Sequence, residues 1–155
     1  MERASRPESH RLRRGRVSEA GRVYLITATC SNRHSFFQPL ASGRTAVLSL
    51  REASDLAETI CFVVMPDHIH WLMQLGEGAS LDRAVGKVKA ATTRRLRSLC
   101  PELEQIRIWQ PGFHDRALRR QEDLRAVARY VVANPIRAGL AETVGDYALW
   151  DACWL

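Results

Sequence analysis

The chain has 155 residues, of which 46% are hydrophobic, and a formal net charge of +6 at neutral pH. This length and composition suffice for one substantial core, and without internal repeats or a long Pro/Gly/Ser-rich linker they indicate a single domain. No run approaches the roughly 18 apolar residues of a membrane span, and no apolar segment follows the basic N-terminal stretch. We therefore expect neither membrane insertion nor secretion.

The cysteines indicate the compartment in which the protein resides. They stand at positions 30, 61, 100 and 153, form no Cys-x-x-Cys pair and lie partly in apolar segments. Reduced thiols fit this pattern better than a disulfide or zinc framework. We predict a cytoplasmic protein.

The basic residues indicate a nucleic-acid partner. All of them except Lys87 and Lys89 are arginine, which binds phosphate bidentately and stacks on exposed bases. Residues 1–16 form a polar arm, with residues 17–155 as the domain. The cluster in this arm consists of Arg11, Arg13, Arg14 and Arg16. Ordering of the arm on DNA and a disordered solubilising tail are both open interpretations.

The hydrophobic patterns predict seven elements in the order βαββαβα. They are a strand at 22–31, a helix at 42–54, strands at 59–65 and 68–75, a helix at 81–99, a strand-like stretch at 113–118 and a helix ending near 134. A short extended segment at 106–109 precedes the last strand. This order predicts an α+β, ferredoxin-like sandwich in which a mostly antiparallel sheet carries helices on one face.

The strand at 68–75 places two histidines on one face. Because side chains alternate along a strand, His68 and His70 point away from the core, while Ile69 and every second residue after it point into it. Same-face neighbours have Cα atoms about 6.6 Å apart, which allows two imidazoles to bind one cation at nitrogen–metal distances of about 2.0–2.2 Å. Two solvated polar side chains would show the same spacing. The triplet alone leaves both interpretations open.

The helix at 81–99 combines an apolar stripe with a basic back. The stripe consists of Leu81, Val85, Val88, Thr92, Leu96 and Leu99. The cations opposite are Arg83, Lys87, Arg94 and Arg97. Because Asp82 is the only acid in this segment, we predict that this face follows the phosphates of DNA. The alternative interpretation is an ordinary solvated helix face, which is also charged.

The last predicted helix carries a tyrosine at its border. Apolar residues recur at i, i+3, i+4 and i+7 from Leu124, and Pro135 disfavours helical geometry at Asn134, so the helix should end about there. At 100° per residue, Tyr130 and Asn134 share a strip beside the apolar stripe. Such a tyrosine is either a held but accessible functional group or a boundary residue with a wet hydroxyl.

Four blocks resemble a known family, the REP-associated tyrosine transposases, which belong to the single-tyrosine HUH transposases and relaxase-like nucleases. The blocks are VVMPDHIH at 63–70, WQPGFHDR at 109–116, LRAVARY at 124–130 and VVANPIRAGL at 131–140. The similarity covers about residues 15–147. The His-x-His pattern together with Tyr-x-x-x-Asn-Pro is far more specific than either half.

The resemblance implies roles for these residues. His68 and His70 would bind a divalent metal, Tyr130 would be the nucleophile, and Asn134 would supply a third ligand. It also implies the ferredoxin-like fold, with the tyrosine helix crossing the outer face of the His-bearing strand, and a substrate of hairpin-forming repetitive extragenic palindromes. His114 lies in one block and either approaches the scissile phosphate or the metal, or hydrogen-bonds within the fold.

The ligand set implied by the resemblance predicts weak metal binding. Two imidazoles and a carboxamide are neutral, so the cation's charge is uncompensated until a DNA phosphate completes the shell. Mixed nitrogen and oxygen ligation favours Mn²⁺ over Mg²⁺. Mg²⁺ is the more abundant ion in cells, and both stay candidates.

We therefore expect a metal-dependent, single-stranded DNA endonuclease and strand transferase that forms a 5′-phosphotyrosine at Tyr130. Two other functions stay open: a hairpin-binding protein with weak catalysis, and a hydrolase in which the histidines activate water. Asp67 stands where the family block more often has Asn, and its charge could attract the cation or repel DNA phosphate. A monomer and a homodimer both stay possible, and residues 146–155 could dock onto the core or join an interface.

Overall fold

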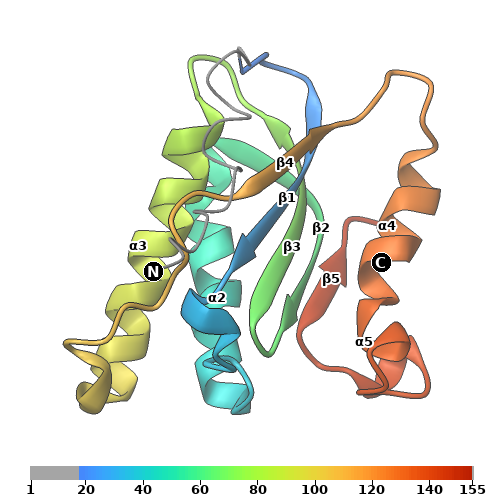
Figure 1. Cartoon of the computed structure of the whole chain (residues 1–155). Helices are drawn as coiled ribbons and strands as arrows, with labels where there is room; N and C mark the ends of the chain where they lie inside the picture. The colour runs from blue at the N-terminus through green and yellow to red at the C-terminus, as the bar shows by residue number, and fades with distance from the viewer. Residues whose placement is uncertain (1–17, 155) are drawn as a thin grey trace, which may run out of the picture.

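The computed structural model describes residues 18–154, so the four arginines of the predicted N-terminal arm lie outside the described residues. The strands are β1 (Val23–Thr29), β2 (Ala57–Met65), β3 (His68–Leu75), β4 (His114–Ala117) and β5 (Trp150–Ala152) (Figure 1). The helices are α2 (Leu40–Glu52), α3 (Leu81–Leu99), α4 (Leu124–Val132) and α5 (Asn134–Arg137). The strands form one sheet in the order β4-β1-β3-β2-β5, and every neighbouring pair is antiparallel. The α+β class and the antiparallel sheet are thus confirmed.

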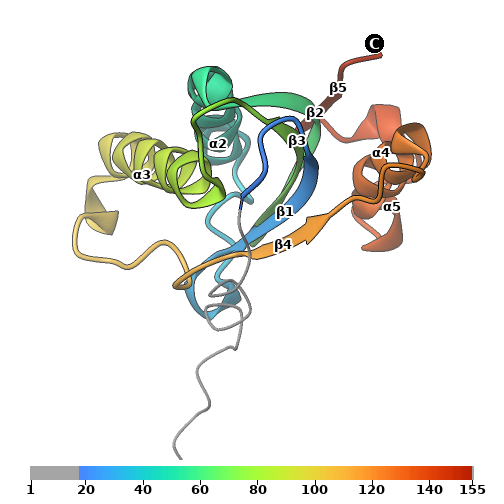
Figure 2. The same ribbon diagram turned by 90° about the horizontal axis from the view of Figure 1, so that it is seen from above.

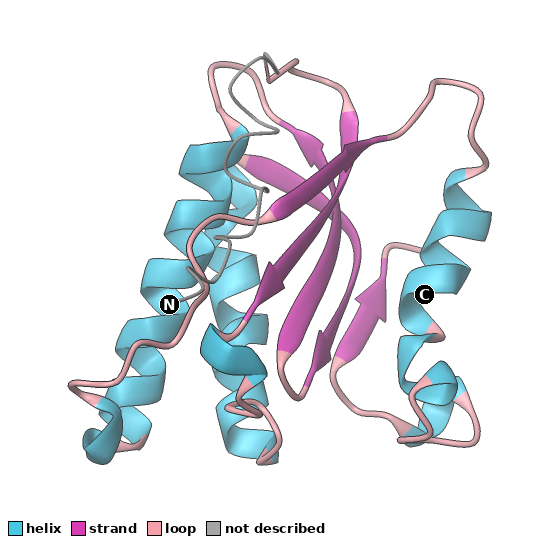
Figure 3. Cartoon of the chain, viewed as in Figure 1, coloured by secondary structure: helices cyan, strands magenta, loops and turns pink. Residues whose placement is uncertain are grey.

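Helices cover both faces of the sheet. The helices α2 and α3 lie on one face and α4 lies on the other (Figures 2 and 3). The prediction of helices on one face is therefore wrong for α4. The physical reason is that the second face is itself apolar, with Val63, Met65 and Leu72 buried on it, and a sheet face of this kind must pack against another layer.

The alternation predicted for β3 is confirmed. Ile69, Trp71 and Met73 belong to the core beneath α2 and α3. The Trp71 indole N–H is satisfied by Thr59 Oγ1 at 2.9 Å. The histidines consequently lie on the face that α4 covers.

Helix α3 has the predicted bounds, and its Ser80 side chain accepts a hydrogen bond from the Arg83 backbone N–H at the N-terminus. Its apolar stripe is shorter than predicted. Leu96 is fully buried, whereas Leu99 is 49% exposed. The last turn of α3 extends beyond the core, so Leu99 does not belong to the stripe.

The aromatic C-terminal segment docks onto the core. It adds β5 to the free edge of β2, and the Tyr147 hydroxyl donates to the Val64 carbonyl at 2.6 Å. Leu149 lies so close to α2 that a Cβ at Gly43 would overlap its side chain. A side chain at position 43 would therefore force the Leu149 side chain to move, and glycine allows the tail to pack closely on α2.

Two further expectations concern the thiols and the membrane. All four cysteines are free, and burial raises the pKa of both Cys30 and Cys61 to about 12, which keeps these thiols protonated. None of the helices in residues 18–154 is long and apolar enough to cross a membrane.

Candidate active site

The two histidines of β3 form a close pair. Their ring centroids are 4.7 Å apart and the ring planes are almost perpendicular, at 82°. His68 opens the strand and His70 follows on the same face, as the alternation predicts. Both rings are partly buried. The strand therefore presents two imidazoles to one point beside it.

Each ring is held through its Nδ1 atom. His68 Nδ1 lies 2.7 Å from Asp67 Oδ1, and His70 Nδ1 lies 2.9 Å from Thr27 Oγ1. A carboxylate only accepts, so the His68 proton resides on Nδ1 in the neutral ring. Among the described residues neither Nε2 atom has a hydrogen-bond partner. Metal-binding histidines are commonly held in this way, with a partner at one ring nitrogen and the metal at the other, and at His68 the carboxylate also fixes the tautomer.

Asp67 is tied to the protein by two partners. Besides His68, it accepts a hydrogen bond at 3.1 Å from Arg33 Nε. Burial acts to raise the pKa of Asp67, but the hydrogen bonds and positive charges of His68 and Arg33 outweigh it and hold the pKa below its usual value. Arg33 follows Asn32 in a turn where both residues have positive φ, 52° and 53° respectively. The acid beside the site thus orients His68.

His70 is neutral at physiological pH. Burial, together with the positive charges of His68 and Arg137, lowers its pKa to about 4. A neutral imidazole needs no proton removed before its nitrogen can bind a cation.

Tyr130 and Arg137 contact each other. Tyr130 lies in the last turn of α4 and is 63% exposed. The Arg137 guanidinium carbon lies 3.8 Å from the centroid of the Tyr130 ring, in cation–π geometry. Asp123 caps the N-terminus of α4, where its carboxylate accepts from the N–H groups of Arg125 and Ala126.

Asn134 opens α5, immediately after α4. Pro135 fits there because the first turn of a helix needs no N–H from it. The predicted helix end is therefore confirmed to within two residues, but the chain re-enters a helix instead of leaving it. This second helix carries Arg137 back over Tyr130. The Asn134 side chain is half-buried.

His114 lies beside the pair and not in it. Thr27 on β1 is directly opposite both His70 on β3 and His114 on β4, so the three side chains form a row across one face of the sheet. Two strand spacings separate the backbones of the two histidines, about 10 Å. His114 is exposed, which places it at the rim of the site.

The basic back of α3 lies on the opposite side of the sheet from the histidines. Several of its cations are engaged within the fold. Lys87 pairs with Asp55 at 2.8 Å, and the Arg97 guanidinium donates to the carbonyls of Leu103 and Ile106. The helix formed as predicted, but its charges do not adjoin the histidine and tyrosine side chains. The same holds for Arg83 and Arg94, which α3 also carries.

The sequence profile of the family described as "Transposase IS200 like" matches residues 22–134. The chain belongs to the IS200-like transposase family. The matched range includes the histidine pair, Tyr130 and Asn134. Arg137 falls just outside it.

Two curated relatives of this transposase are REP-associated tyrosine transposases. The chain is 33% identical over 98 residues to a putative one from Haemophilus influenzae, covering 58% of this chain and 56% of that protein. It is 29% identical over 132 residues to one from Escherichia coli, covering 82% of this chain and 74% of that protein. The match thus spans only about half the length of the first relative.

Two solved structures share the transposase fold. A REP-associated tyrosine transposase bound to a REP hairpin superposes with a TM-score of 0.67 at 25% identity, covering 87% of this chain and 79% of that one. A putative transposase from Deinococcus radiodurans superposes with a TM-score of 0.54 at 24% identity, covering 78% and 94%. The second likeness concerns the fold alone.

The sequence patterns did not single out Arg137 and Thr27. Arg137 was visible in a family block and stands seven residues after Tyr130, a spacing that returns to the same helical strip. Thr27 carried no such signal, because it meets His70 only through the pairing of β1 with β3.

Proposed function

We propose that the chain is a metal-dependent, single-stranded DNA endonuclease and strand transferase that uses Tyr130 as its nucleophile. The observation that carries this proposal is that two elements meet on one face of the sheet. Strand β3 presents a pair of imidazoles whose Nε2 atoms have no hydrogen-bond partner among residues 18–154. Helix α4 packs on the same face and carries an exposed tyrosine against the Arg137 guanidinium.

The imidazole pair fits a divalent cation. Both rings share one face, both are oriented through Nδ1, and His70 is neutral. No group of three or more His, Cys, Asp or Glu side chains in residues 18–154 could hold a metal, so further ligands would come from Asn134, solvent or the DNA. A bound cation would polarise a non-bridging phosphate oxygen and offset the charge that develops on it.

The reaction transfers a phosphodiester to the tyrosine. Tyr130 Oη attacks the phosphorus, the bond to the 3′ oxygen breaks, and the leaving oxygen gains a proton while the tyrosine loses one. The products are a 5′-phosphotyrosine and a free 3′-hydroxyl. Because the new ester keeps the energy of the old one, another 3′-hydroxyl can attack it and rejoin strands.

Arg137 is suited to hold the reacting phosphate. Its guanidinium lies against the ring of Tyr130 and acts on His70, so a phosphate between the tyrosine and the histidines would meet its N–H groups. The substrate we propose is a DNA hairpin with a single-stranded flank, since a relative with the same fold was solved on a REP hairpin.

The test uses such a hairpin, labelled separately at its 5′ and 3′ ends, with Mn²⁺ and the full chain. A covalent adduct carrying only the label on the 3′ side of the break supports the proposal, because that fragment bears the 5′ phosphate. Two free fragments without an adduct would favour a hydrolase that activates water. Binding without cleavage, with or without Mn²⁺, would favour a hairpin-binding module.

Replacing Arg137 tests its role in the step. Arg137→Ala should slow adduct formation about 100-fold, the usual effect of removing one donor to a developing negative charge, while hairpin affinity changes little. Arg137→Lys should restore part of the rate because it keeps the charge. Single-turnover rates and anisotropy titrations separate the two effects. The matched control is Arg129→Ala, an exposed arginine of α4 adjacent to Tyr130; an equal loss in both variants would contradict a specific role for Arg137.

The Asp67–His68 hydrogen bond should tune metal affinity. Asp67→Leu removes the partner that orients His68 and should weaken Mn²⁺ binding about 10- to 100-fold, whereas Asp67→Asn keeps an acceptor and should lose less. Bound Mn²⁺ is counted by electron paramagnetic resonance of the Tyr130→Phe protein on DNA, where no turnover intervenes. Arg33→Ala removes only the exposed partner of Asp67. If Arg33→Ala weakened binding as much as Asp67→Leu, the effect would not act through His68.

A further inference from the structure

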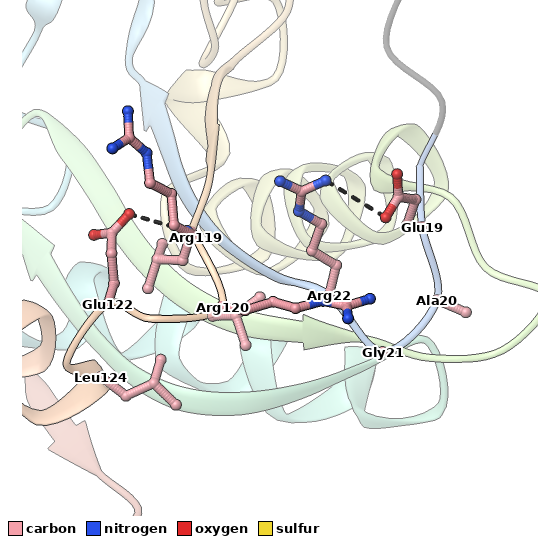
Figure 4. Close-up of a pocket in the computed structure, with 10 residues that line it drawn as sticks. Glu19, Ala20, Gly21, Arg22, Arg119, Arg120, Glu122 and Leu124 are labelled. Carbon is pink, nitrogen blue, oxygen red and sulfur yellow. Dashed lines mark hydrogen bonds and ion pairs between the residues drawn. The ribbon is translucent and has the colours of Figure 1, made fainter.

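An arginine pocket lies at the other end of the sheet from the histidines. It has a volume of about 560 Å³, and its basic residues are Arg22 before β1 and Arg119 and Arg120 after β4. Figure 4 shows the Arg22 and Arg119 side chains extending to the same side, away from Leu124. The chain thus brings three guanidinium groups from two distant segments to one hollow.

The acids of the arginine pocket are already engaged. Glu122 accepts from the Arg119 backbone N–H and from Arg116 Nη1, both at 3.0 Å, and these contacts hold its pKa below the usual value. Glu19 accepts from Arg22. The Arg120 guanidinium has no hydrogen bond or ion pair with any described residue. The pocket therefore offers positive charge and unused donors to an outside acceptor.

The arginine pocket lies at the rim of the sheet, where its apolar lining reaches the face that carries the histidine pair while Arg22 and Arg119 extend toward the other face. Its apolar lining of Val23, Leu118 and Leu124 belongs to the cluster beneath α4, as does Leu72 beside the histidines. In the register of β1 with β3, Val23 pairs with Gln74 and Thr29 pairs with His68. Six residues at about 3.3 Å each put the pocket roughly 20 Å from His68 along the strands.

Strand β4 connects the two ends on this face. His114 pairs with Thr27, and Arg116, two residues later, pairs with Leu25 on the same side of the sheet. His114 and Arg116 therefore lie on this face between the histidine pair and the arginine pocket. The basic back of α3 lies on the other side of the sheet.

We propose that the arginine pocket binds a backbone phosphate of the same DNA whose strand reacts at Tyr130, about 20 Å from the histidine pair. At 3.4 Å per base pair this separation corresponds to roughly six base pairs of a B-form stem. The pocket would fix where along the DNA the scissile phosphate lies. This inference rests on the proposed function for the identity of the ligand.

The test compares two double variants of equal charge change. Arg119→Ala/Arg120→Ala removes two guanidinium groups of the pocket, and Arg83→Ala/Arg94→Ala removes two from the back of α3. Affinity for a fluorescent hairpin is measured by anisotropy across a range of salt concentrations. The pocket variant should bind about tenfold more weakly, and the slope of log affinity against log salt should shrink by about one per lost phosphate contact. The α3 variant should bind like the wild type.

A series of stems gives the position of the contact. Stems trimmed to about three base pairs cannot reach the pocket, so wild type and pocket variant should bind them equally. Equal binding of long stems by both proteins, or an equal loss on short and long stems, would overturn the proposal. Circular dichroism melts confirm that both variants fold. Binding is measured without cleavage, so a protein that forms no adduct at Tyr130 still tests the pocket. If the adduct forms and the pocket variant binds like the wild type, only the proposal for the pocket is refuted.

Discussion

Tyr130→Phe is expected to abolish the covalent adduct, lowering its rate of formation by at least about 1,000-fold, because the substitution removes the attacking oxygen itself. Hairpin affinity should stay within about twofold of the wild type. The ring remains, and with it the contact to Arg137. Adduct formation is followed on denaturing gels with a labelled hairpin, and affinity by anisotropy on the same substrate.

The fold should tolerate this substitution. Tyr130 is 63% exposed, so the free energy of unfolding should change by no more than about 0.5 kcal/mol. The matched control is Tyr147→Phe, which removes a hydroxyl bonded to the Val64 carbonyl. That control should lose stability and keep the adduct. Cleavage that survives Tyr130→Phe at the wild-type rate would contradict the nucleophile assignment.

His70→Ala should cause the second largest loss. Without one of the two imidazoles the site cannot hold its cation, so adduct formation should fall by at least about 100-fold at saturating DNA. Added Mn²⁺ should restore part of the rate, since the defect lies in metal affinity. Isothermal titration of the wild type should also show metal binding weaker than micromolar before DNA is added, because the imidazoles are neutral ligands.

The control for this loss is another histidine. His34→Ala removes a ring that stacks on Phe36 in the loop after β1 and takes no part in the pair. It should form the adduct at the wild-type rate with the wild-type dependence on Mn²⁺. A His70→Ala protein with unchanged Mn²⁺ dependence would show that the pair is not the metal site.

The elements that sequence predicts well are those whose pattern is complete within the element. Strand β3 alternates except at Leu72, and α3 carries both a long stripe and a serine N-cap, so their bounds agree with the structure. Strand β5 is three residues long and owes its existence to pairing with β2 and to Leu149 docking on α2. No local sequence pattern predicts such a strand.

The site residues likewise divide into those that a local pattern predicts and those that depend on contacts between elements. Local spacing singled out His68, His70 and Tyr130 as candidates, because alternation and helical phase are properties of one element. The side of the sheet on which each helix lies depends on how the chain crosses over, so the basic back of α3 was predicted correctly and yet lies away from the histidines. Thr27 and the arginine pocket both arise from strand pairing, which a local pattern does not contain.

Mapping the DNA-linked peptide tests the central claim most directly. Trypsin cleaves after Arg129 and Arg137, so the three tyrosines of the chain fall on three different peptides, and Tyr130 is the first residue of the peptide 130–137. The adduct is trapped on the hairpin with Mn²⁺, digested with nuclease and trypsin, and analysed by mass spectrometry. We predict a nucleotide phosphate attached to peptide 130–137 at Tyr130. Its attachment to the peptide of Tyr24 or Tyr147, or to a histidine, would contradict the proposed mechanism.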